Sequence, residues 1–263
     1  MGEGAYRPMK AAVIGAGNVA WHLARALDRH CHVCKVFSRD IDHASALAAR
    51  LGNATPIDNV ADIDSDIDLA VVCVKDNAIA AVLDAVPEAT RDALWLHTSG
   101  GCGIEVFGSR FRNCGVLYPL QTFTRDAAVD VDSIPFFIEG NSEATLQRIR
   151  TIAEMLSPTV FDADSDTRRK LHIAAVFACN FTNHLCALAR DILAPTGIPF
   201  SALMPLIDAT VEKLRQMPPE KAQTGPAVRG DSKVINAHLD TISDENIKNI
   251  YSIITNSIIN YHK

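Results

Sequence analysis

The sequence predicts an α/β fold in which a doubly wound, mainly parallel sheet domain (residues 9–162) precedes an all-helical domain (residues 163–263). Three observations predict this arrangement. A short apolar strand near the N-terminus runs directly into a glycine turn and a helix, strand and helix patterns then alternate to about residue 160, and strand patterns stop after residue 164. Alternating strands and helices are typical of a parallel sheet covered by helices on both faces.

The first strand and its turn occupy residues 9–20, MKAAVIGAGNVA. Gly15 permits a tight turn, Gly17 lets the backbone approach a pyrophosphate, and Ala20 is small enough for close packing of the helix on the strand. Free N–H groups at the start of the helix attract phosphate charge. This pattern predicts a Rossmann-type dinucleotide site, and a turn without a ligand is the alternative. The candidate cofactor-binding residues of the turn are Gly15, Ala16, Gly17, Asn18 and Val19.

Apolar periodicity predicts the rest of the sheet. Strands are expected at 33–37 and 55–57, on either side of a helix over 40–51 whose apolar residues recur at helical spacing. The continuous apolar run 69–74 is typical of a parallel strand buried on both faces. The remaining expected elements are strands at 94–97, 115–118, 135–138 and 160–161 and a helix over 142–156.

The second domain is expected to be helical. One long helix is predicted over 166–193, because proline and glycine follow it. Another helix is expected from about 201 to 217, and a loop rich in glycine and proline covers 222–231. The last helix, after Ser243, carries several isoleucines on one face, which indicates a domain or subunit interface.

Composition and charge argue against several classes of protein. The formal net charge is −6, the isoelectric point is about 5.8, and the basic residues are scattered, so the electrostatic footprint of a nucleic-acid-binding protein is missing. No apolar run approaches the roughly 20 residues that span a bilayer, and the polar N-terminus lacks the core of a signal peptide. We therefore expect a cytoplasmic protein with no nucleic-acid or membrane partner.

The seven cysteines are an odd number, and most of them lie in apolar segments. This usage fits a reducing compartment better than a disulfide framework. Cys31 and Cys34 are the one close pair. Because no second pair accompanies them, packing is favoured over metal or redox use, and no metal site is expected.

The end of the second predicted strand indicates which dinucleotide binds. An acidic residue at this place would bind the 2′-hydroxyl of NAD, but here Ser38 and Arg39 follow the strand. A hydroxyl and a guanidinium suit a 2′-phosphate, so the sequence favours NADP over NAD. Asp40 leaves NAD as an alternative, because this residue either caps the next helix or contacts a ribose.

In open α/β sheets, ligands bind beyond the carboxyl ends of the strands. Val74 and Lys75 follow the run 69–74 and are cofactor-binding candidates, whereas Asp76 is expected to cap the next helix. Ser99, in the loop after 94–97, is a further cofactor-binding candidate, and His97 is a candidate proton donor. A turn that satisfies its own backbone is an equal alternative for both residues.

The strand at 115–118 ends in a second group of polar residues. Tyr118, Gln121 and Thr122 follow one another closely there and are candidates for the lining of a substrate cleft. The loop that carries them comes after the neighbouring strand end in the chain, so we expect it to lie at the same edge of the sheet.

The long helix carries a polar face. At 100° per residue, His172, Asn180 and Asn183 fall within about 80° of one another. An imidazole and two amides buried without partners would cost free energy, so either other helices or a ligand must supply those partners. Ordinary hydrogen bonds between helices are the alternative to a catalytic role for these three residues.

Seven segments of the chain, taken together, resemble one family over about residues 9–260. They are GAGNVA, VFSRD, LAVVCVKDNAI, LHTSG, YPLQTFT, LHIAAVFACNFTNHLCALA and TGPAVRGD. The chain is similar to Rossmann-like NADP oxidoreductases that are related to pyrroline-5-carboxylate reductase and to the 6-phosphogluconate dehydrogenase superfamily. The resemblance implies a helical C-terminal domain that often builds a dimer, and a cleft where the loops after 94–97 and 115–118 meet the polar face of the long helix.

Two departures limit what the resemblance implies. Hydroxyacid dehydrogenases of the superfamily use a helix lysine followed four residues later by asparagine, but here Lys170 is followed by Ala174. Related sequences also tend to read HPLQTF where this chain has Tyr118. A phenol is a much weaker acid than an imidazolium, so proton donation at this position has a different chemical basis.

These observations predict an NADP-dependent oxidoreductase that moves hydride between the nicotinamide and a small C=O or C=N substrate. In this interpretation Asn180 and Asn183 orient the substrate, and His172 or His97 donates a proton. One alternative is a sensor or scaffold that binds NADP without turnover, and another is a structural dimer with no ligand. A homodimer formed through the helical domain is expected in the first interpretation.

Overall fold

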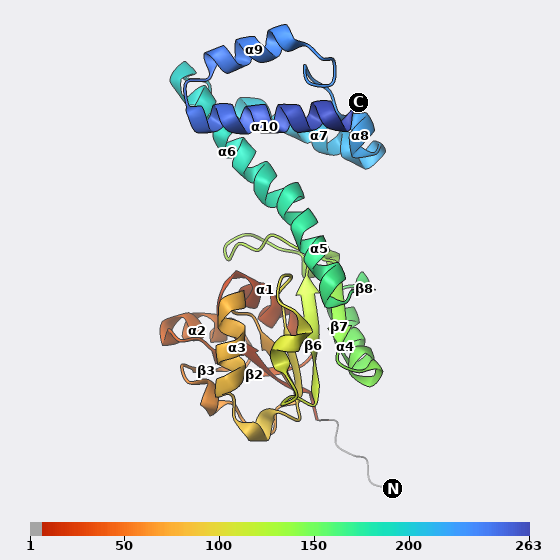
Figure 1. Cartoon of the computed structure of the whole chain (residues 1–263). Helices are drawn as coiled ribbons and strands as arrows, with labels where there is room; N and C mark the ends of the chain where they lie inside the picture. The colour runs from red at the N-terminus through yellow and green to blue at the C-terminus, as the bar shows by residue number, and fades with distance from the viewer. Residues whose placement is uncertain (1–6) are drawn as a thin grey trace. The chain divides into compact units, whose positions relative to one another are not determined.

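A computed structural model describes residues 7–263 (Figure 1). By their internal contacts they form two compact units, a first unit that ends at Phe177 and a second unit, Ala178–Lys263. The division falls inside the long helix. The boundary predicted from the sequence, between residues 162 and 163, therefore remains a prediction.

The first unit contains an eight-stranded sheet in the order β3-β2-β1-β4-β5-β6-β7-β8. Neighbouring strands are parallel except for the antiparallel pair β6 and β7. The strands are β1 (Lys10–Ile14), β2 (His32–Phe37), β3 (Thr55–Ile57), β4 (Leu69–Val72), β5 (Leu94–His97), β6 (Asn113–Pro119), β7 (Phe136–Gly140) and β8 (Val160–Asp162). The predicted doubly wound sheet is confirmed.

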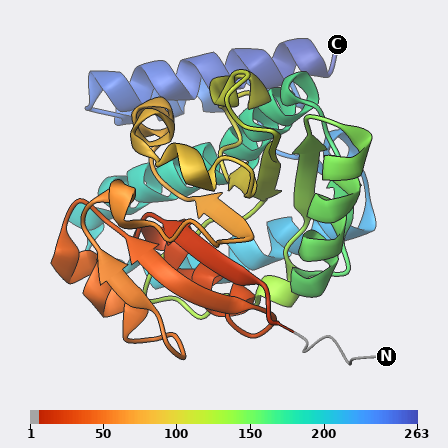
Figure 2. The same cartoon turned by 90° about the horizontal axis from the view of Figure 1, so that it is seen from below.

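The sheet is covered on both faces because its central strands are apolar on both sides. All four residues of β4 are buried, as the continuous apolar run predicted. One core cluster joins the sheet to α1 (Asn18–Leu27), α2 (Ile41–Ala48) and α4 (Glu143–Leu156), and the other joins it to α3 (Asp76–Ala85). Figure 2 shows the first unit from below, with helices on both sides of the strands.

Local chemistry fixes where these helices begin. The Asp40 carboxylate accepts a hydrogen bond from the backbone N–H of Asp42 and caps α2, and the Ser142 hydroxyl accepts from Thr145 N and caps α4.

The strand order places β1 between β2 and β4. From β1 the chain adds β2 and β3 on one side, and it then crosses to the other side of β1 to add β4 and the later strands. The carboxyl ends of β1 and β4 are therefore the switch point of the sheet, where ligands bind in such folds.

The long helix is present but interrupted. It consists of α5 (Ser165–Ala175), a π-helical segment over Val176–Phe181, and α6 (Thr182–Leu193). Wider i→i+5 turns change the angle between successive residues. The angular positions computed at 100° per residue therefore do not extend from His172 across this segment to Asn183, and the single polar face expected from the sequence is not established.

The second unit is helical, as predicted. Besides α6 it contains α7 (Met204–Gln216), α8 (Pro219–Ala222), α9 (Ser232–Thr241) and α10 (Glu245–Tyr261). Pro205 lies in the first turn of α7, where a missing N–H is tolerated. The Asp231 and Asp244 side chains cap α9 and α10. The sequence had not predicted α9.

Among the described residues, one helical stretch, Ser165–Thr196, is long and apolar enough to cross a membrane by length and composition alone. This differs from the expectation that no part of the chain is apolar enough. Such a test is weak grounds for a membrane span, because core helices also pass it. None of its apolar window is buried within the described residues.

Candidate functional site

The turn after β1 has the geometry of a dinucleotide site. Gly15 has a φ of 124°, a backbone conformation that side chains disfavour. A Cβ atom there would lie 2.5 Å from the carbonyl oxygen of Cys73, at the end of β4. The Gly15 N–H also donates to the Phe37 carbonyl at 2.8 Å. Only glycine fits where the ends of β1, β2 and β4 meet.

Gly17 has the opposite surroundings. It precedes α1 with extended backbone angles, and a Cβ built on it meets no described heavy atom within 4 Å. No side chain caps the first turn of α1, so the backbone N–H groups there are available to an anion. Ala16 and Val19 are half-buried, and Gly17 and Asn18 are exposed. This open, uncapped turn fits the pyrophosphate of a dinucleotide.

The residues after β2 fit a 2′-phosphate. Asp40 is occupied as the cap of α2, and its carboxylate also lies 3.6 Å from the His43 Nδ1. The Ser38 hydroxyl accepts a hydrogen bond from the Asp40 N–H at 3.3 Å, while Arg39 is exposed. Of the two roles considered for Asp40, the structure shows the helix cap. Ser38 and Arg39 thus remain the polar groups that would meet the ribose.

The end of β4 contributes to the same turn. Val74 Cγ1 lies 3.3 Å from the Cβ position of Gly15, so this side chain packs against the glycine turn. Lys75 is exposed and occupies the capping position of α3 without a capping hydrogen bond. Asp76 is the first helical residue rather than the cap, which corrects the expected position by one residue. Its carboxylate reaches the loop after β5, at 3.1 Å from the Cβ position of Gly101.

His97 is an interior residue. Its side chain is completely buried at the end of β5 and stacks on Phe107 with ring centroids 5.6 Å apart. Burial, reinforced by the positive charge of Arg168, lowers the pKa of His97 to about 4. Its Nδ1 accepts from the Ser99 N–H at 3.2 Å. A neutral, enclosed imidazole cannot reach a substrate, so the structure does not support the expected role of His97 as proton donor.

The Ser99 hydroxyl forms its hydrogen bonds with the backbone of its own loop. Its hydroxyl accepts hydrogen bonds from the backbone N–H groups of Gly101 and Cys102, at 3.1 and 2.8 Å. The side chain is buried. This is the structural alternative that the sequence left open, a turn that pairs its own backbone. A direct contact between the Ser99 hydroxyl and a cofactor remains a prediction.

Tyr118 and His172 form a pair across the end of the sheet. The Tyr118 hydroxyl lies 3.1 Å from Nδ1 of His172, and the two rings meet edge to face. Gly100 fits closely against both, since a Cβ there would lie 2.7 Å from Tyr118 Cζ and 2.8 Å from His172 Nδ1. Burial raises the pKa of the Tyr118 hydroxyl, opposed by the charge of Arg168. The loop after β5, the end of β6 and α5 therefore meet in the first unit.

Arg168 holds this arrangement together, and sequence reasoning missed it. The side chain is fully buried, and its guanidinium donates to Glu139 Oε2 at 2.5 Å, to the Ser99 carbonyl at 3.2 Å and to the Cys102 carbonyl at 2.7 Å. Ser165 joins by donating to Glu139 Oε2 at 2.8 Å. One helix is thereby tied to the loop after β5 and to β7. The sequence feature that could have indicated Arg168 is its position one helical turn before His172.

Gln121 and Thr122 lie in an exposed loop after β6. The Gln121 side-chain oxygen accepts from the Thr122 N–H at 2.8 Å. The next residues of the loop are anchored to α1, because His22 Nε2 lies 2.9 Å from the Thr124 carbonyl and Arg125 stacks over the Trp21 ring at 3.9 Å. This part of the loop is thus held against α1. A substrate contact by Gln121 or Thr122 remains a prediction.

Asn180 and Asn183 belong to the second unit, and both are exposed. Asn180 lies in the π-helical segment and Asn183 in the first turn of α6. The pair formed by Tyr118 and His172 lies in the first unit. The contact of Asn180 and Asn183 with substrate remains a prediction. Of the residues expected on the polar helix face, His172 is the one joined to the sheet.

The cysteine pair behaves as packing. Cys31 is buried and its Sγ donates to the Leu27 carbonyl, while Cys34 Sγ donates to the Ala11 carbonyl. Burial raises the pKa of Cys31 to about 12, so this thiol stays protonated and is a poor nucleophile or metal ligand. Within residues 7–263, no group of three or more His, Cys, Asp and Glu side chains is placed to hold a metal ion.

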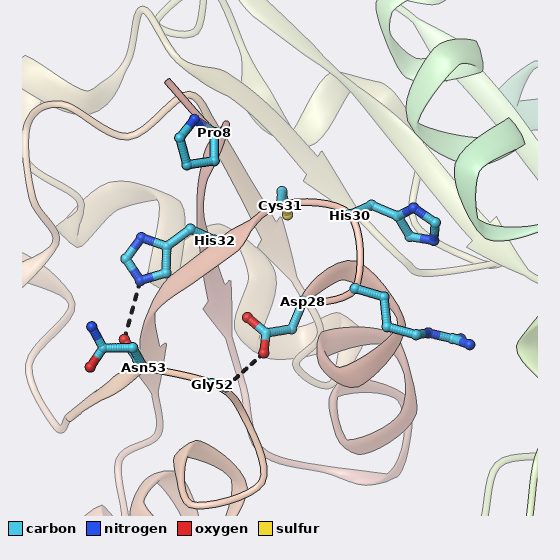
Figure 3. A pocket seen from close by; sticks show the side chains of 8 residues that line it. Pro8, Asp28, His30, Cys31, His32, Gly52 and Asn53 are labelled. Atoms are coloured by element: carbon cyan, nitrogen blue, oxygen red, sulfur yellow. Dashed lines mark hydrogen bonds between the residues drawn. The ribbon is translucent and has the colours of Figure 1, made fainter. Parts of the chain in front are cut away.

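A hollow of about 360 Å³ lies at the opposite edge of the sheet from the glycine turn. Figure 3 shows its lining, including Asp28, His32 and Asn53. The Asp28 carboxylate accepts the Gly52 N–H at 2.7 Å, and His32 Nε2 lies 3.2 Å from the Asn53 carbonyl. These polar groups satisfy the backbone at the amino ends of the strands, so the hollow is not part of the cofactor site.

Two family models match the chain. The model described as NADP oxidoreductase coenzyme F420-dependent covers residues 10–98, which include the glycine turn and the end of β5. The model described as a domain of unknown function (DUF2520) covers residues 134–258. No curated protein matches the sequence.

Solved structures match nearly the whole chain. The "putative NADP oxidoreductase BF3122" from Bacteroides fragilis is 37% identical, with 96% of this chain and 98% of that chain covered and a TM-score of 0.88. Protein TM1727 from Thermotoga maritima is 25% identical, with coverage of 96% and 98% and a TM-score of 0.70. An imine reductase from Myxococcus stipitatus in complex with NADP+ is 18% identical, with coverage of 95% and 92% and a TM-score of 0.64, and it shows the shared fold alone.

Proposed function

The chain belongs to the NADP oxidoreductase family that includes the Bacteroides fragilis protein, and we propose that it transfers hydride between the nicotinamide of NADP and a small C=O or C=N substrate. The glycine turn at the switch point of the sheet is the observation that carries this proposal. Gly15 is confined by Cys73, Gly17 is open, and α1 begins without a side-chain cap. A turn with these three properties is built to accept a dinucleotide phosphate.

The chain offers a set of groups for each part of NADP. The N–H groups around Ala16, Gly17, Asn18 and Val19 would hold the pyrophosphate. Ser38 and Arg39 would bind the 2′-phosphate, because a guanidinium pairs with phosphate through two parallel hydrogen bonds. Bound NADP supplies or accepts the hydride, and the protein supplies position and electrostatics.

His172 and Tyr118 are the proposed proton donors. Reduction of a C=O or C=N bond by hydride leaves a negative oxygen or nitrogen that must take up a proton. With His97 enclosed in the core, His172 is the remaining histidine of the original pair of candidates. The 3.1 Å contact between Tyr118 Oη and His172 Nδ1 allows a proton to pass between the two side chains.

Asn180 and Asn183 stay in the proposal as residues that orient the substrate. Amide side chains can donate to a carbonyl oxygen and accept from an amine, so they suit either substrate class. Their exposure leaves these amides free to meet a ligand. What supports the proposal is their chemistry and the implied family cleft.

The second unit also supports a homodimer. Among residues 178–263, only Ala227 and Thr255 are buried, although this unit contains many large apolar side chains. Helices that bury so little need another surface to cover their apolar faces. A second copy of this chain, packed through the helical unit, is the proposed cover.

The experiment that tests the proposed function is a spectrophotometric screen of NADPH oxidation with keto acids and cyclic imines. Turnover of at least one substrate class is expected. A Gly17→Val variant should lose NADPH binding by calorimetry and keep its circular dichroism spectrum, because the new side chain occupies open space where the phosphate would lie. Wild-type affinity in this variant would contradict the proposed cofactor site.

A sensor that binds NADP without turnover is the second candidate. The departure at Ala174, where relatives with dehydrogenase activity have asparagine four residues after the lysine, favours it. Tight NADPH binding with no oxidation across the whole panel would support the sensor over the enzyme.

A further inference from the structure

A second hollow, of about 410 Å³, lies on the first unit along the outer side of α1. It is lined by His22 and Arg25 from α1, Arg29 just after this helix, Arg50 after α2, and Val129 and Val131 from the loop after β6. Arg25 comes two helical turns after Gly17, which corresponds to roughly 12 Å along the helix axis. This hollow is therefore separate from the turn that would hold the cofactor.

Three arginines line this hollow. Arg25 lies in the last turn of α1 and Arg29 lies two residues beyond its end, and two like charges that line the same hollow repel each other. The carbonyl end of a helix favours a basic residue, which accounts for one arginine near Leu27. It does not account for Arg50, which arrives from a different element.

Few negatively charged side chains lie close to these arginines. In the described part of the chain, Arg29 has an exposed partner, Asp132, at 3.7 Å, and neither Arg25 nor Arg50 has a carboxylate within 4.0 Å. Asp28 also lines the hollow, but its two oxygens accept backbone N–H groups of Val33 and Gly52 at 3.2 and 2.7 Å. The hollow therefore keeps an excess of positive charge on a protein whose net charge is −6.

The walls of the hollow are fixed by stacking. Trp21 is 8% exposed, and Arg50 lies over its ring at 5.9 Å. Arg125 stacks on the same ring at 3.9 Å and anchors the loop that carries Val129. A guanidinium that stacks on an aromatic ring keeps its N–H edge free for an oxyanion.

We propose that this hollow binds the phosphate group of a small phosphorylated molecule between Arg25, Arg29 and Arg50. Arginine forks match the oxygen geometry of phosphate, and a dianion or higher charge would neutralise the repulsion among the three groups. The valine side of the hollow would contact the apolar part of the same ligand. The site is distinct from the glycine turn and independent of turnover.

Calorimetric titration of the full-length protein with sodium pyrophosphate at low ionic strength tests the proposal. Wild type should bind saturably, and an Arg25→Gln/Arg50→Gln variant should bind at least tenfold more weakly. An Arg112→Gln variant is the matched control, because Arg112 is an exposed arginine of the same unit that lies outside this hollow. In a Gly17→Val variant, which blocks the anion-binding turn before α1, the binding event that depends on Arg25 and Arg50 should remain.

Three outcomes would overturn the proposal. Pyrophosphate binding that is lost in Gly17→Val and kept in the double arginine variant would place the anion at the cofactor turn. Binding that does not saturate would show only general attraction between charges. Equal affinity for malonate at the same ionic strength would reject phosphate as the ligand class.

Discussion

Two glycines of one turn are required for opposite reasons. Gly15 has no room for a side chain, because the Cys73 carbonyl would lie 2.5 Å from its Cβ, whereas Gly17 has open space around it. A substitution at Gly15 is therefore expected to disturb the meeting of β1 and β4, and one at Gly17 to block a ligand. Only the residue-scale geometry separates these two effects.

Arg39 is expected to set the preference for NADPH over NADH. A charge-assisted pair with the 2′-phosphate contributes on the order of 1.5–3 kcal/mol, so Arg39→Ala should weaken NADPH about tenfold or more and change NADH little. Dissociation constants for both cofactors by calorimetry measure this. Arg112→Ala, at an exposed arginine elsewhere in the first unit, is the control. Equal losses for the two cofactors would instead indicate that Arg39 supports adenine or the local structure.

His97 is expected to make the protein acid-sensitive. The folded state lowers the pKa of His97 from 6.5 to about 4, so its neutral form is favoured on folding. This contribution to stability is fully present above pH 6.5 and is lost as the pH falls toward 4, up to about 3 kcal/mol. Urea unfolding at pH 7 and pH 4.5 should show a smaller acid loss in His97→Gln than in wild type.

The control for this prediction is His43→Gln, because the His43 side chain is 61% exposed. That variant should keep the acid loss of wild type. The same acid loss in His97→Gln as in wild type would show that other groups cause the pH dependence.

At the scale of elements, one buried side chain ties α5 to the sheet. Arg168 binds Glu139 of β7 and two carbonyls in the loop after β5, and Ser165 completes the network. The same helix carries His172 one turn later. The position of the proposed proton donor therefore depends on this contact, although Arg168 itself does not meet a substrate.

Arg168→Ala should destabilise the first unit by about 3–5 kcal/mol, because Glu139, whose side chain is only 15% exposed, would lose its ion-pair partner. Urea denaturation monitored by circular dichroism measures the loss. Arg169→Ala, on the same helix but 44% exposed, should change stability by less than about 1 kcal/mol. Similar losses in the two variants would contradict a special role for the buried network.

The π-helical segment Val176–Phe181 is an element that no sequence periodicity indicated. It occupies the stretch where the two compact units divide. A wider turn displaces the side chains that follow, so the faces of α5 and α6 must be considered separately. For this reason the amides of Asn180 and Asn183 cannot be grouped with His172 by angle alone.

At the scale of the whole molecule, the two units differ in how they are stabilised. The first unit has apolar clusters on both faces of its sheet, and the second unit buries almost no side chains within the chain. Ile253 is 69% exposed and Ile254 is 37% exposed on α10. We propose that a second copy of this chain covers these apolar side chains.

Ile254→Glu should dissociate the proposed dimer or cause aggregation, because a charge would be buried without a partner. Light scattering measures the mass of the variant in solution. Asn256→Glu, an exposed position on the same helix, is the matched control and should keep the wild-type mass. A monodisperse Ile254→Glu protein with wild-type mass would contradict the interface. A monomeric wild type that binds lipid vesicles would point to a membrane as the cover.

Features that depend on neighbouring residues could be predicted from the amino-acid sequence. The glycine turn, the buried run at β4, the short strands and the all-helical second half follow from local backbone freedom and apolar periodicity, and the structure confirms them. These signals are strong because a turn with positive φ or a strand buried on both faces tolerates few residue types.

Contacts between side chains far apart in the chain became known from the three-dimensional fold. Tyr118 and His172 are 54 residues apart, and Arg168 and Glu139 are 29 apart, so no spacing pattern links them. The enclosure of His97 was equally invisible in the sequence, because it depends on Phe107 and on the loop after β5, which pack around the end of that strand. The π-helical interruption has no signal in the residue periodicity. Long-range packing sets the burial and hence the pKa, and these decide whether a polar residue is available for chemistry.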